Sequence, residues 1–203
     1  MLVMSSTTET YQFDAGNLGL DFANTLRNGE GGIVDLLRFG SDLERWMASA
    51  GMPHLDPSVD LSAPTPTARL LLTEAIRLRD DIEVLVSAFS GRCGLPYPAL
   101  HSINRTLDAS RRQTQVEMIE GHASLETSEV GDSPLAPLVP IALAAATLVA
   151  EADPSRVRRC ASERCRLWFL DSSKNGRRRW CSMARCGNRA KVARHHRKRS
   201  AGT

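Results

Sequence analysis

The sequence contains no apolar run long enough to cross a membrane. Its most apolar stretch, PLVPIALAAATLVA at 137–150, includes two prolines and is shorter than the roughly 20 apolar residues that a spanning helix needs. The amino-terminal MLVMSSTTET also lacks the basic segment followed by an apolar segment that is typical of a secretory signal. These absences argue against a membrane partner and lead us to expect an intracellular, cytoplasmic protein.

Common signatures of catalysis are missing as well. The chain has no glycine-rich phosphate loop, no HExxH motif and no Ser-His-Asp order with a supporting motif. No internal repeat of about 20 to 50 residues is visible, which argues against a solenoid or a propeller. We therefore expect a protein that is not an enzyme.

Cysteine is scarce, but its distribution is informative. Four of the five cysteines form two pairs near the carboxyl end, Cys160 with Cys165 and Cys181 with Cys186. Four residues lie within each pair and fifteen between the pairs, which allows four thiolates to reach one tetrahedral zinc ion. A redox switch or disulfides could use the same residues, but intracellular thiols stay reduced, so we favour zinc.

The other candidate ligands are weaker. His195 and His196 could bind a metal, but four cysteines already complete a closed zinc shell. Cys93 stands alone between glycines and is expected to be an ordinary free thiol. The predicted site therefore consists of the four paired cysteines.

Charge is divided sharply along the chain. Residues 156–203 carry 16 Lys or Arg and two acidic residues, a net charge of +14, whereas residues 1–155 carry 10 basic and 21 acidic residues, a net charge of −11. Such asymmetry indicates two modules with different partners. The basic module could contact nucleic acid, although a solvated tail or a face that docks on the acidic module would have the same composition.

Local patterns predict the elements of the basic module. RLWFLD at 166–171 is expected to be a strand, Asn175-Gly176 a turn and RWCS at 179–182 the returning strand of a hairpin. NRAKVARHHRKRS at 188–200 predicts a basic helix. The expected nucleic-acid contacts are Arg178, Arg179, Arg189, Lys191, Arg194 and Lys198. Trp168 and Trp180 are expected to pack the small core rather than to stack on bases.

The first 150 residues predict a mainly helical domain with one β-hairpin. Apolar residues spaced by three or four indicate helices over 42–50, 67–90 and 98–110, and a very apolar helix over 141–150 that fills the core. Ser41 is the expected N-cap of the helix over 42–50. Alternation around a turn at 121–122 indicates the hairpin, and LDFANTL at 20–26 could continue as a helix.

Polar residues within LDFANTL invite a functional interpretation. Asp21, Asn24 and Thr25 lie in an apolar context and could line a pocket for a small effector. Such side chains more often cap helices or tie loops, and we favour that structural interpretation. Asp21 and Asn24 are thus only a weak ligand-site candidate.

The basic module resembles a known family. Its segment RRCASERCRLWFLDSSKNGRRRWCSMARCGNRAKVARHHRKR is similar to CGNR-type zinc fingers, whose naming tetrapeptide stands here at 186–189. The preceding residues resemble the ABATE domain, mainly through GLDFANTL and ERWMASAG. The resemblance implies a bacterial stress-induced transcription regulator with one zinc ion per chain, and it points to Arg189 and Lys191 as family-typical positions. Gly187 is expected either to adopt a positive φ angle or to allow a close approach of the backbone to the ligand cysteines. Asn188 is expected to be the N-cap of the following helix.

Together these observations predict an α+β protein. Residues 1–10 are expected to be disordered, 11–153 to form a mainly α domain with a small β-hairpin, 156–199 to form a four-cysteine zinc finger of a β-hairpin plus basic helix, and 200–203 to be a tail. The predicted function is DNA-binding transcription regulation, with an N-terminal domain that senses an effector or forms a homodimer. The alternative is a protein-interaction or thiol-redox module without nucleic-acid binding. Charge alone does not distinguish DNA from RNA.

Overall fold

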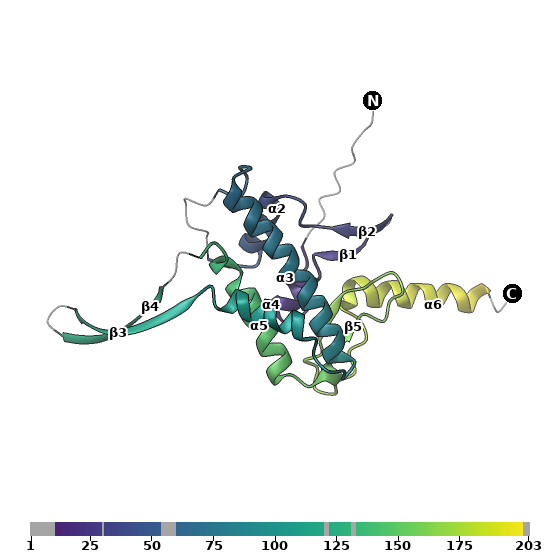
Figure 1. The fold of residues 1–203 in the computed structure, drawn as a ribbon. Helices are drawn as coiled ribbons and strands as arrows, with labels where there is room; N and C mark the ends of the chain where they lie inside the picture. Colours follow the sequence, from purple (N-terminus) through teal and green to yellow (C-terminus); the bar gives the residue numbers. More distant parts are fainter. Residues whose placement is uncertain (1–10, 30, 54–59, 120–121, 131–132, 201–203) are drawn as a thin grey trace, which may run out of the picture.

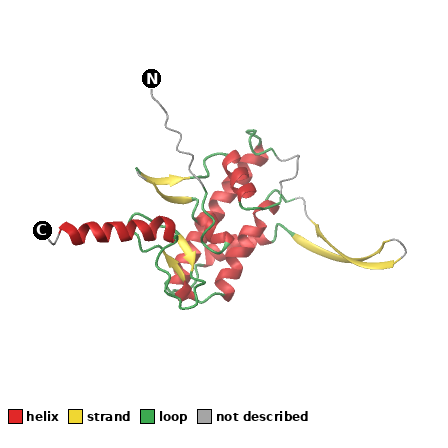
Figure 2. Ribbon diagram, turned by 180° about the vertical axis from the view of Figure 1, so that it is seen from behind, coloured by secondary structure: helices red, strands yellow, loops and turns green. Residues whose placement is uncertain are grey.

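The computed structural model describes residues 11–29, 31–53, 60–119, 122–130 and 133–200. The expected disordered start and most of the expected tail therefore lie outside the described residues. A helical body forms the centre of the molecule, and a β-hairpin and a long basic helix extend from it on opposite sides (Figures 1 and 2). The body contains α1 (Leu18–Ala23), α2 (Gly40–Ser49), α3 (Pro66–Ser90), α4 (Tyr97–Leu107) and α5 (Val139–Glu151).

The long helix α3 begins and packs as its sequence predicts. Thr65 is its N-cap, and the Thr65 side chain accepts a hydrogen bond from the amide of Ala68 at 3.1 Å. Pro66 occupies the first turn, where a missing N–H has no cost. The predicted apolar face is buried, which confirms the helix and its orientation; it consists of Leu71, Ala75, Leu78, Ile82, Leu85 and Phe89.

Helix α2 is confirmed, but its predicted cap is wrong. Phe39, in an extended conformation, is the N-cap in place of Ser41. The carboxylate of Asp42 accepts hydrogen bonds from the amides of Arg38 at 3.0 Å and Phe39 at 2.9 Å. A carboxylate in the first turn thus satisfies the free amides from within the helix. The expected apolar face, which includes Trp46 and Met47, is buried.

The remaining helices of the body complete the core. In α4 the buried residues are Ala99, Ile103 and Thr106, so its inward face is rotated from the predicted one, and Asn104 is exposed. Helix α5 fills the core as expected and packs closely on α1. A Cβ atom at Gly19 of α1 would lie 3.0 Å from the Cβ of Ala145 of α5, so a larger residue there would separate the two helices. No helix in the described residues is long and apolar enough to cross a bilayer.

Two hairpins belong to the amino-terminal part. The predicted one is present as β3 (Arg111–Ile119) and β4 (His122–Val130), which are antiparallel with Val116 opposite Leu125. The other, β1 (Leu26–Gly29) with β2 (Gly32–Asp35), corrects the expectation that the helix continues through 20–26. Helix α1 ends at Ala23, and the Thr25 hydroxyl donates to the carbonyl of Phe22 at 2.7 Å, which favours a turn over another helical turn.

The carboxyl-terminal module contains one short sheet and one long helix. Strand β6 (Trp168–Leu170) is confirmed, but its partner is β5 (Val157–Arg159), not the predicted segment 179–182. The chain does turn at Gly176, which has φ of 57°. It then passes alongside the first cysteine pair, where the amide of Ala161 donates to the carbonyl of Arg179 at 2.9 Å. Two 3-10 turns, Ala136–Leu138 and Pro154–Arg156, flank α5.

Helix α6 (Asn188–Ser200) confirms the predicted basic helix, with a different beginning. One π-helical stretch, Met183–Gly187, leads directly into it, so Asn188 has helical dihedral angles and is not its N-cap. Gly187 does not have a positive φ angle, and a glycine is needed there because the side chains of Met183 and Trp180 lie close to its Cα. A Cβ atom there would lie 2.6 Å from the sulfur of Met183 and 3.3 Å from Cδ1 of Trp180.

The two modules share a core. Val157, Leu167, Trp168 and Phe169 are buried in the same apolar cluster as the helices of the body. The amide of Leu170 also donates to the carbonyl of Ala15 at 2.7 Å, so β6 is held to the chain that precedes α1. The predicted division near residue 153 is thus bridged by packing, and the separation into two domains stays a prediction.

Candidate metal centre

The structure brings the four paired cysteines into one cluster. Cys160 follows β5, Cys165 precedes β6, Cys181 lies before the π-helical stretch and Cys186 lies within it. The four sulfur atoms all lie within 4.8 Å of one another. The sulfur of Cys181 is 3.7 Å from that of Cys165 and 3.7 Å from that of Cys186. Cys160, Cys181 and Cys186 are buried, and Cys165 is partly exposed.

This arrangement fits a tetrahedral zinc ion. With zinc–sulfur bonds of about 2.3 Å, neighbouring sulfurs of a tetrahedron lie about 3.8 Å apart, close to the separations observed here. A disulfide needs about 2.05 Å, and all four cysteines are free. His195 and His196 lie exposed on α6 outside the cluster, and Cys93 is an exposed free thiol, as expected.

The thiols of the cluster differ in acidity. The hydrogen bond from Cys181 lowers the pKa of Cys165 to about 5. The same hydrogen bond, together with burial and neighbouring thiols, raises the pKa of Cys181, and burial raises the pKa of Cys160. The cluster therefore shares protons among closely spaced sulfurs. A divalent cation would replace those protons, so metal binding should release them.

Arg189 belongs to the immediate surroundings of the cluster. Its Nη2 donates a hydrogen bond to the sulfur of Cys186 at 3.2 Å. A tetrathiolate zinc centre carries a formal charge of −2, and a guanidinium in contact with one sulfur offsets part of it. Arg189 thus differs from the other predicted nucleic-acid residues, because its side chain contacts a sulfur of the cysteine cluster.

Glu83 on α3 holds the cluster-bearing module against the helical body. Its carboxylate accepts a hydrogen bond from Nε1 of Trp168 at 2.6 Å and forms an ion pair with Arg159, while Arg166 lies 3.5 Å away. The guanidinium of Arg159 also lies 4.3 Å from the ring centroid of Trp168. Trp168 is buried, so its role is packing, as expected from the sequence.

The weak ligand-site candidates have structural partners. Asn24 bonds the backbone of Trp168 in both directions: Nδ2 donates to the carbonyl at 2.9 Å, and Oδ1 accepts from the amide at 2.8 Å. Oδ1 of Asp21 accepts from the amide of Ala15 at 3.0 Å, and burial raises the pKa of Asp21 to about 6. These contacts favour the structural interpretation. The ligand role itself stays untested, and neither residue lines the two cavities described below.

Arg178 is engaged within the module. Its guanidinium donates to the carbonyl oxygens of Asp14, Leu170, Trp180 and Cys181. It also lies 4.6 Å from the ring centroid of Phe169. These contacts use most of its donor capacity, so Arg178 ties the turn after β6 to the core.

Other predicted nucleic-acid residues gather at a groove. Arg179, Lys191 and Arg194 line a groove of about 270 Å³ on one side of α6, together with Trp180, Gly187, Ala190 and Arg197. We call this the α6 groove. Arg197 was not singled out by the sequence, although its spacing of three residues from Arg194 places it on the same side. The side chain of Lys198 is outside what the structure describes.

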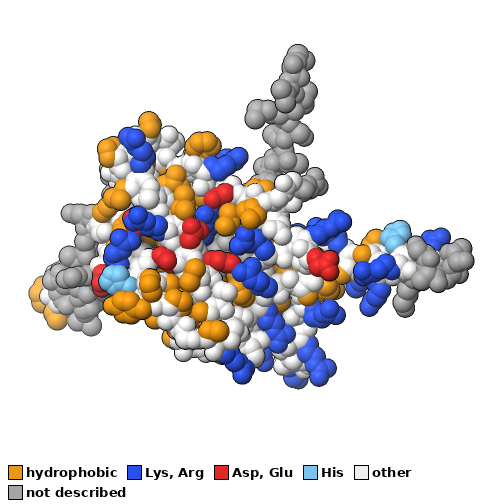
Figure 3. Space-filling view, turned by 45° about the vertical axis from the view of Figure 1, so that its right-hand side comes forward, with side chains coloured by type: hydrophobic (Ala, Val, Ile, Leu, Met, Phe, Trp, Pro, Cys, Tyr) orange, Lys and Arg blue, Asp and Glu red, His pale blue; other side chains and the backbone are white. Residues whose placement is uncertain are grey.

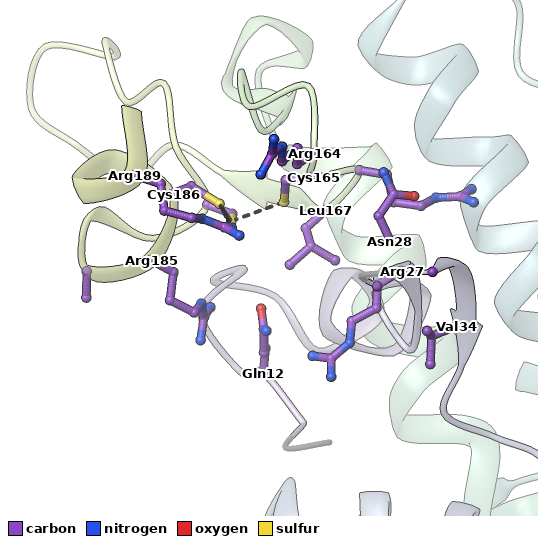
Figure 4. A pocket seen from close by; sticks show the side chains of 15 residues that line it. Gln12, Arg27, Asn28, Val34, Arg164, Cys165, Leu167, Arg185, Cys186 and Arg189 are labelled. Carbon is purple, nitrogen blue, oxygen red and sulfur yellow. Dashed lines mark hydrogen bonds between the residues drawn. The ribbon is translucent and has the colours of Figure 1, made fainter. Parts of the chain in front are cut away.

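A larger cavity of about 750 Å³ lies between the cysteine cluster and the β1–β2 hairpin (Figure 4). We call it the hairpin–finger cavity. Its lining includes Gln12 before α1, Arg27 on β1, Arg164 beside the first cysteine pair, and Arg189. Sequence reasoning missed it because the lining comes from segments separated by more than a hundred residues, and no local pattern joins them.

Comparison with known families identifies both modules. Residues 156–199 match the CGNR zinc finger, and residues 16–152 match the ABATE family, which is described as "Putative stress-induced transcription regulator". No protein in the curated set matches the chain. The ABATE match covers most of the chain and precedes the finger that contains the cysteine cluster. The chain therefore belongs to the ABATE family and ends in a CGNR zinc finger.

Proposed function

We propose that this protein is a zinc-dependent transcription regulator that binds double-stranded DNA through α6 and the α6 groove. The observation that carries the proposal is the position of α6. The π-helical stretch that leads into α6 contains Cys186 of the cluster, and the helix then extends away from the helical body (Figure 1). A metal-anchored basic helix with free sides has the shape that enters a DNA major groove. Such a regulator would act in the cytoplasm.

The charges of the α6 groove support phosphate binding. Lys191, Arg194 and Arg197 are spaced by three residues along the helix, and Arg179 faces them from the segment before it. The four cations line one groove, and none of the described residues that line it is acidic. Cations this close repel one another, and a polyanion would relieve that repulsion.

The surface around α6 is also strongly basic. Lys and Arg side chains gather over the finger and α6, whereas the helical body displays acidic and basic side chains together (Figure 3). Trp180 lies at the groove with the guanidinium of Arg179 5.2 Å from its ring centroid. Zinc in this proposal is structural: Cys160, Cys165, Cys181 and Cys186 would hold it and so fix the base of α6.

The test is the salt dependence of duplex binding by zinc-loaded protein. Fluorescence anisotropy with a random duplex should show affinity that falls with salt, with a slope of log K of about −0.9 per phosphate neutralised. Replacing Lys191 and Arg194 together by Ala should lower the magnitude of that slope by roughly two units. The matched control replaces Arg38 and Arg69, exposed cations of the helical body, and should leave the slope unchanged.

Absence of salt-dependent affinity for any duplex at low ionic strength would overturn the proposal. The finger would then act as an interaction or redox module. Equal effects of the α6 and control pairs would also overturn it, because net charge rather than the groove would explain the binding. A parallel titration with double-stranded RNA distinguishes the two nucleic acids.

A further inference from the structure

We propose that the hairpin–finger cavity is a binding site for a small phosphorylated metabolite, the size of a nucleoside monophosphate. The site is distinct from the α6 groove and does not depend on DNA binding. It combines a ring of guanidinium groups, a buried amide oxygen without a partner among the described residues and a volume suited to a small molecule. These features come from both modules, so a ligand here would touch the ABATE domain and the finger at once.

Among the residues that the structure describes, the cavity is lined by several cations and by no acidic residue. Five arginines contribute, from β1, from the segment between β5 and β6, and from the π-helical stretch and α6: Arg27, Arg164, Arg166, Arg185 and Arg189. The guanidinium groups of Arg27, Arg185 and Arg189 surround the same open space (Figure 4). Guanidinium forks match the oxygens of a phosphate group and can bind it bidentately.

The arginines of the lining differ in their acidic partners. Arg185 pairs with Asp14, and Arg166 shares Glu83 with Arg159. The thiolates around a zinc ion would offset two more positive charges. Arg164, by contrast, is exposed with no acidic partner among the residues that the structure describes. A phosphate monoester, with its charge of about −1.5 to −2, is a strong partner for such a guanidinium group.

Gln12 is an independent indication of a ligand. It lines the cavity, and its Oε1 is buried without a hydrogen-bond partner in the described part of the chain. A buried polar atom without a partner is costly, and such atoms are normally satisfied by a ligand or by water. Its amide lies at the space that the guanidinium groups surround (Figure 4). Because this oxygen is covered in the structure, the amide of Gln12 has to turn toward the cavity before a hydroxyl or amino group of the ligand can donate to it.

Size and position favour a small molecule over a DNA backbone. A volume of about 750 Å³ far exceeds that of an isolated phosphate ion and lies in the range of metabolite sites. The cavity also faces away from the α6 groove. At about 100° per residue along a helix, Lys191 and Arg194 lie roughly 200° and 140° around α6 from Arg189. A duplex seated on the α6 groove would therefore leave the cavity open on the other side.

The test is direct ligand binding to zinc-loaded, full-length protein without DNA. Calorimetric titration with AMP, and with inorganic phosphate as the smallest probe, should show saturable binding below about 10 mM, tighter for AMP. The ligand should also raise the melting temperature, because it binds only the folded state. Zinc content is measured before and after each titration, so that metal loss is not counted as binding.

Two variants address the site. Arg164→Ala removes an exposed side chain without a described partner and should weaken AMP binding roughly tenfold while leaving folding intact. Ala184→Glu places a carboxylate at another lining position and should abolish binding. The control, Arg177→Ala, removes a similarly exposed arginine of the finger that does not line the cavity and should change nothing.

No saturable AMP or phosphate binding would overturn this proposal and leave DNA binding untouched. Equal weakening by Arg164→Ala and Arg177→Ala would overturn it as well, because general charge would explain the result. If Arg164→Ala lowers duplex affinity while AMP fails to bind, the cavity is part of the DNA surface and the metabolite site is rejected.

Discussion

Asn24 joins the ABATE domain to the finger through both ends of its amide. It lies in the turn after α1, 8% exposed, and pairs with the amide and carbonyl of Trp168 as a neighbouring strand would. Those groups of Trp168 lie on the edge of β6 away from β5. The side chain therefore satisfies two buried backbone groups that no other strand of the described residues reaches.

Replacement of Asn24 by Ala should destabilise the whole protein. Both backbone groups of Trp168 would lose their partner in a buried site, which costs about 2–4 kcal/mol in the free energy of unfolding. Urea denaturation of zinc-loaded protein measures this. Asn104→Ala, at an exposed position of α4, is the matched control and should change the free energy by less than about 0.5 kcal/mol. Equal stability of the two variants would show that the Asn24 pairing contributes nothing.

At the scale of elements, the β3–β4 hairpin contrasts with the helices. It extends from the body as a two-stranded ribbon (Figures 1 and 2), and Val116 and Met118 on it are 68% and 70% exposed. The helices bury a continuous apolar face, but neither of these two strand residues is buried. A ribbon of this kind adds little to the stability of the fold.

Shortening the hairpin should leave the core unchanged. Residues 113–128 can be replaced by an Asn-Gly turn that joins Arg112 to its cross-strand partner Glu129. We expect the free energy of unfolding to change by less than about 1 kcal/mol, whereas Ile103→Ala in the buried face of α4 should cost about 2–4 kcal/mol. Chemical denaturation of both variants measures the difference. A loss above about 2 kcal/mol on shortening would mean that the hairpin packs on the body.

At the scale of the whole molecule, the finger is partly a folded extension of the helical core. Strand β5 accepts a hydrogen bond at the carbonyl of Val157 from the hydroxyl of Ser90 at 2.7 Å, and Phe169 of β6 is fully buried. The folding of the residues beyond β6 depends more on the cysteine cluster, because most of the described side chains of α6 are exposed and do not pack on the core. Metal removal should therefore affect the two parts of the finger differently.

Zinc removal should unfold the end of the chain first. Purified protein should contain about one zinc ion per chain, and chelation should lower the melting temperature, because metal binding contributes several kcal/mol to a module of this kind. Limited trypsin digestion after chelation should cut first within 174–199 and leave β5 and β6 attached to the body. First cuts at 156–159 would instead show that the whole finger separates. Cys93→Ser is the control and should retain both zinc and stability.

Several features followed from the sequence because they depend on neighbours along the chain. The spacing of the two cysteine pairs predicts one metal site, since each pair can present two sulfurs from one short segment. The apolar period of α3 and the composition of α6 predict helices for the same local reason. The N-cap of α2 was predicted wrongly: Phe39 takes the place of Ser41, because the carboxylate of Asp42 satisfies the amides of Arg38 and Phe39 from within the helix.

Tertiary structure alone decided how the modules meet. The partner of β6, the pairing of Asn24 with Trp168 and the contact between Glu83 and Trp168 join residues far apart in the chain. The hairpin–finger cavity likewise exists only because β1 lies beside the cysteine cluster. Such contacts depend on how complete faces pack, and a local sequence pattern carries no information about which distant face will lie opposite.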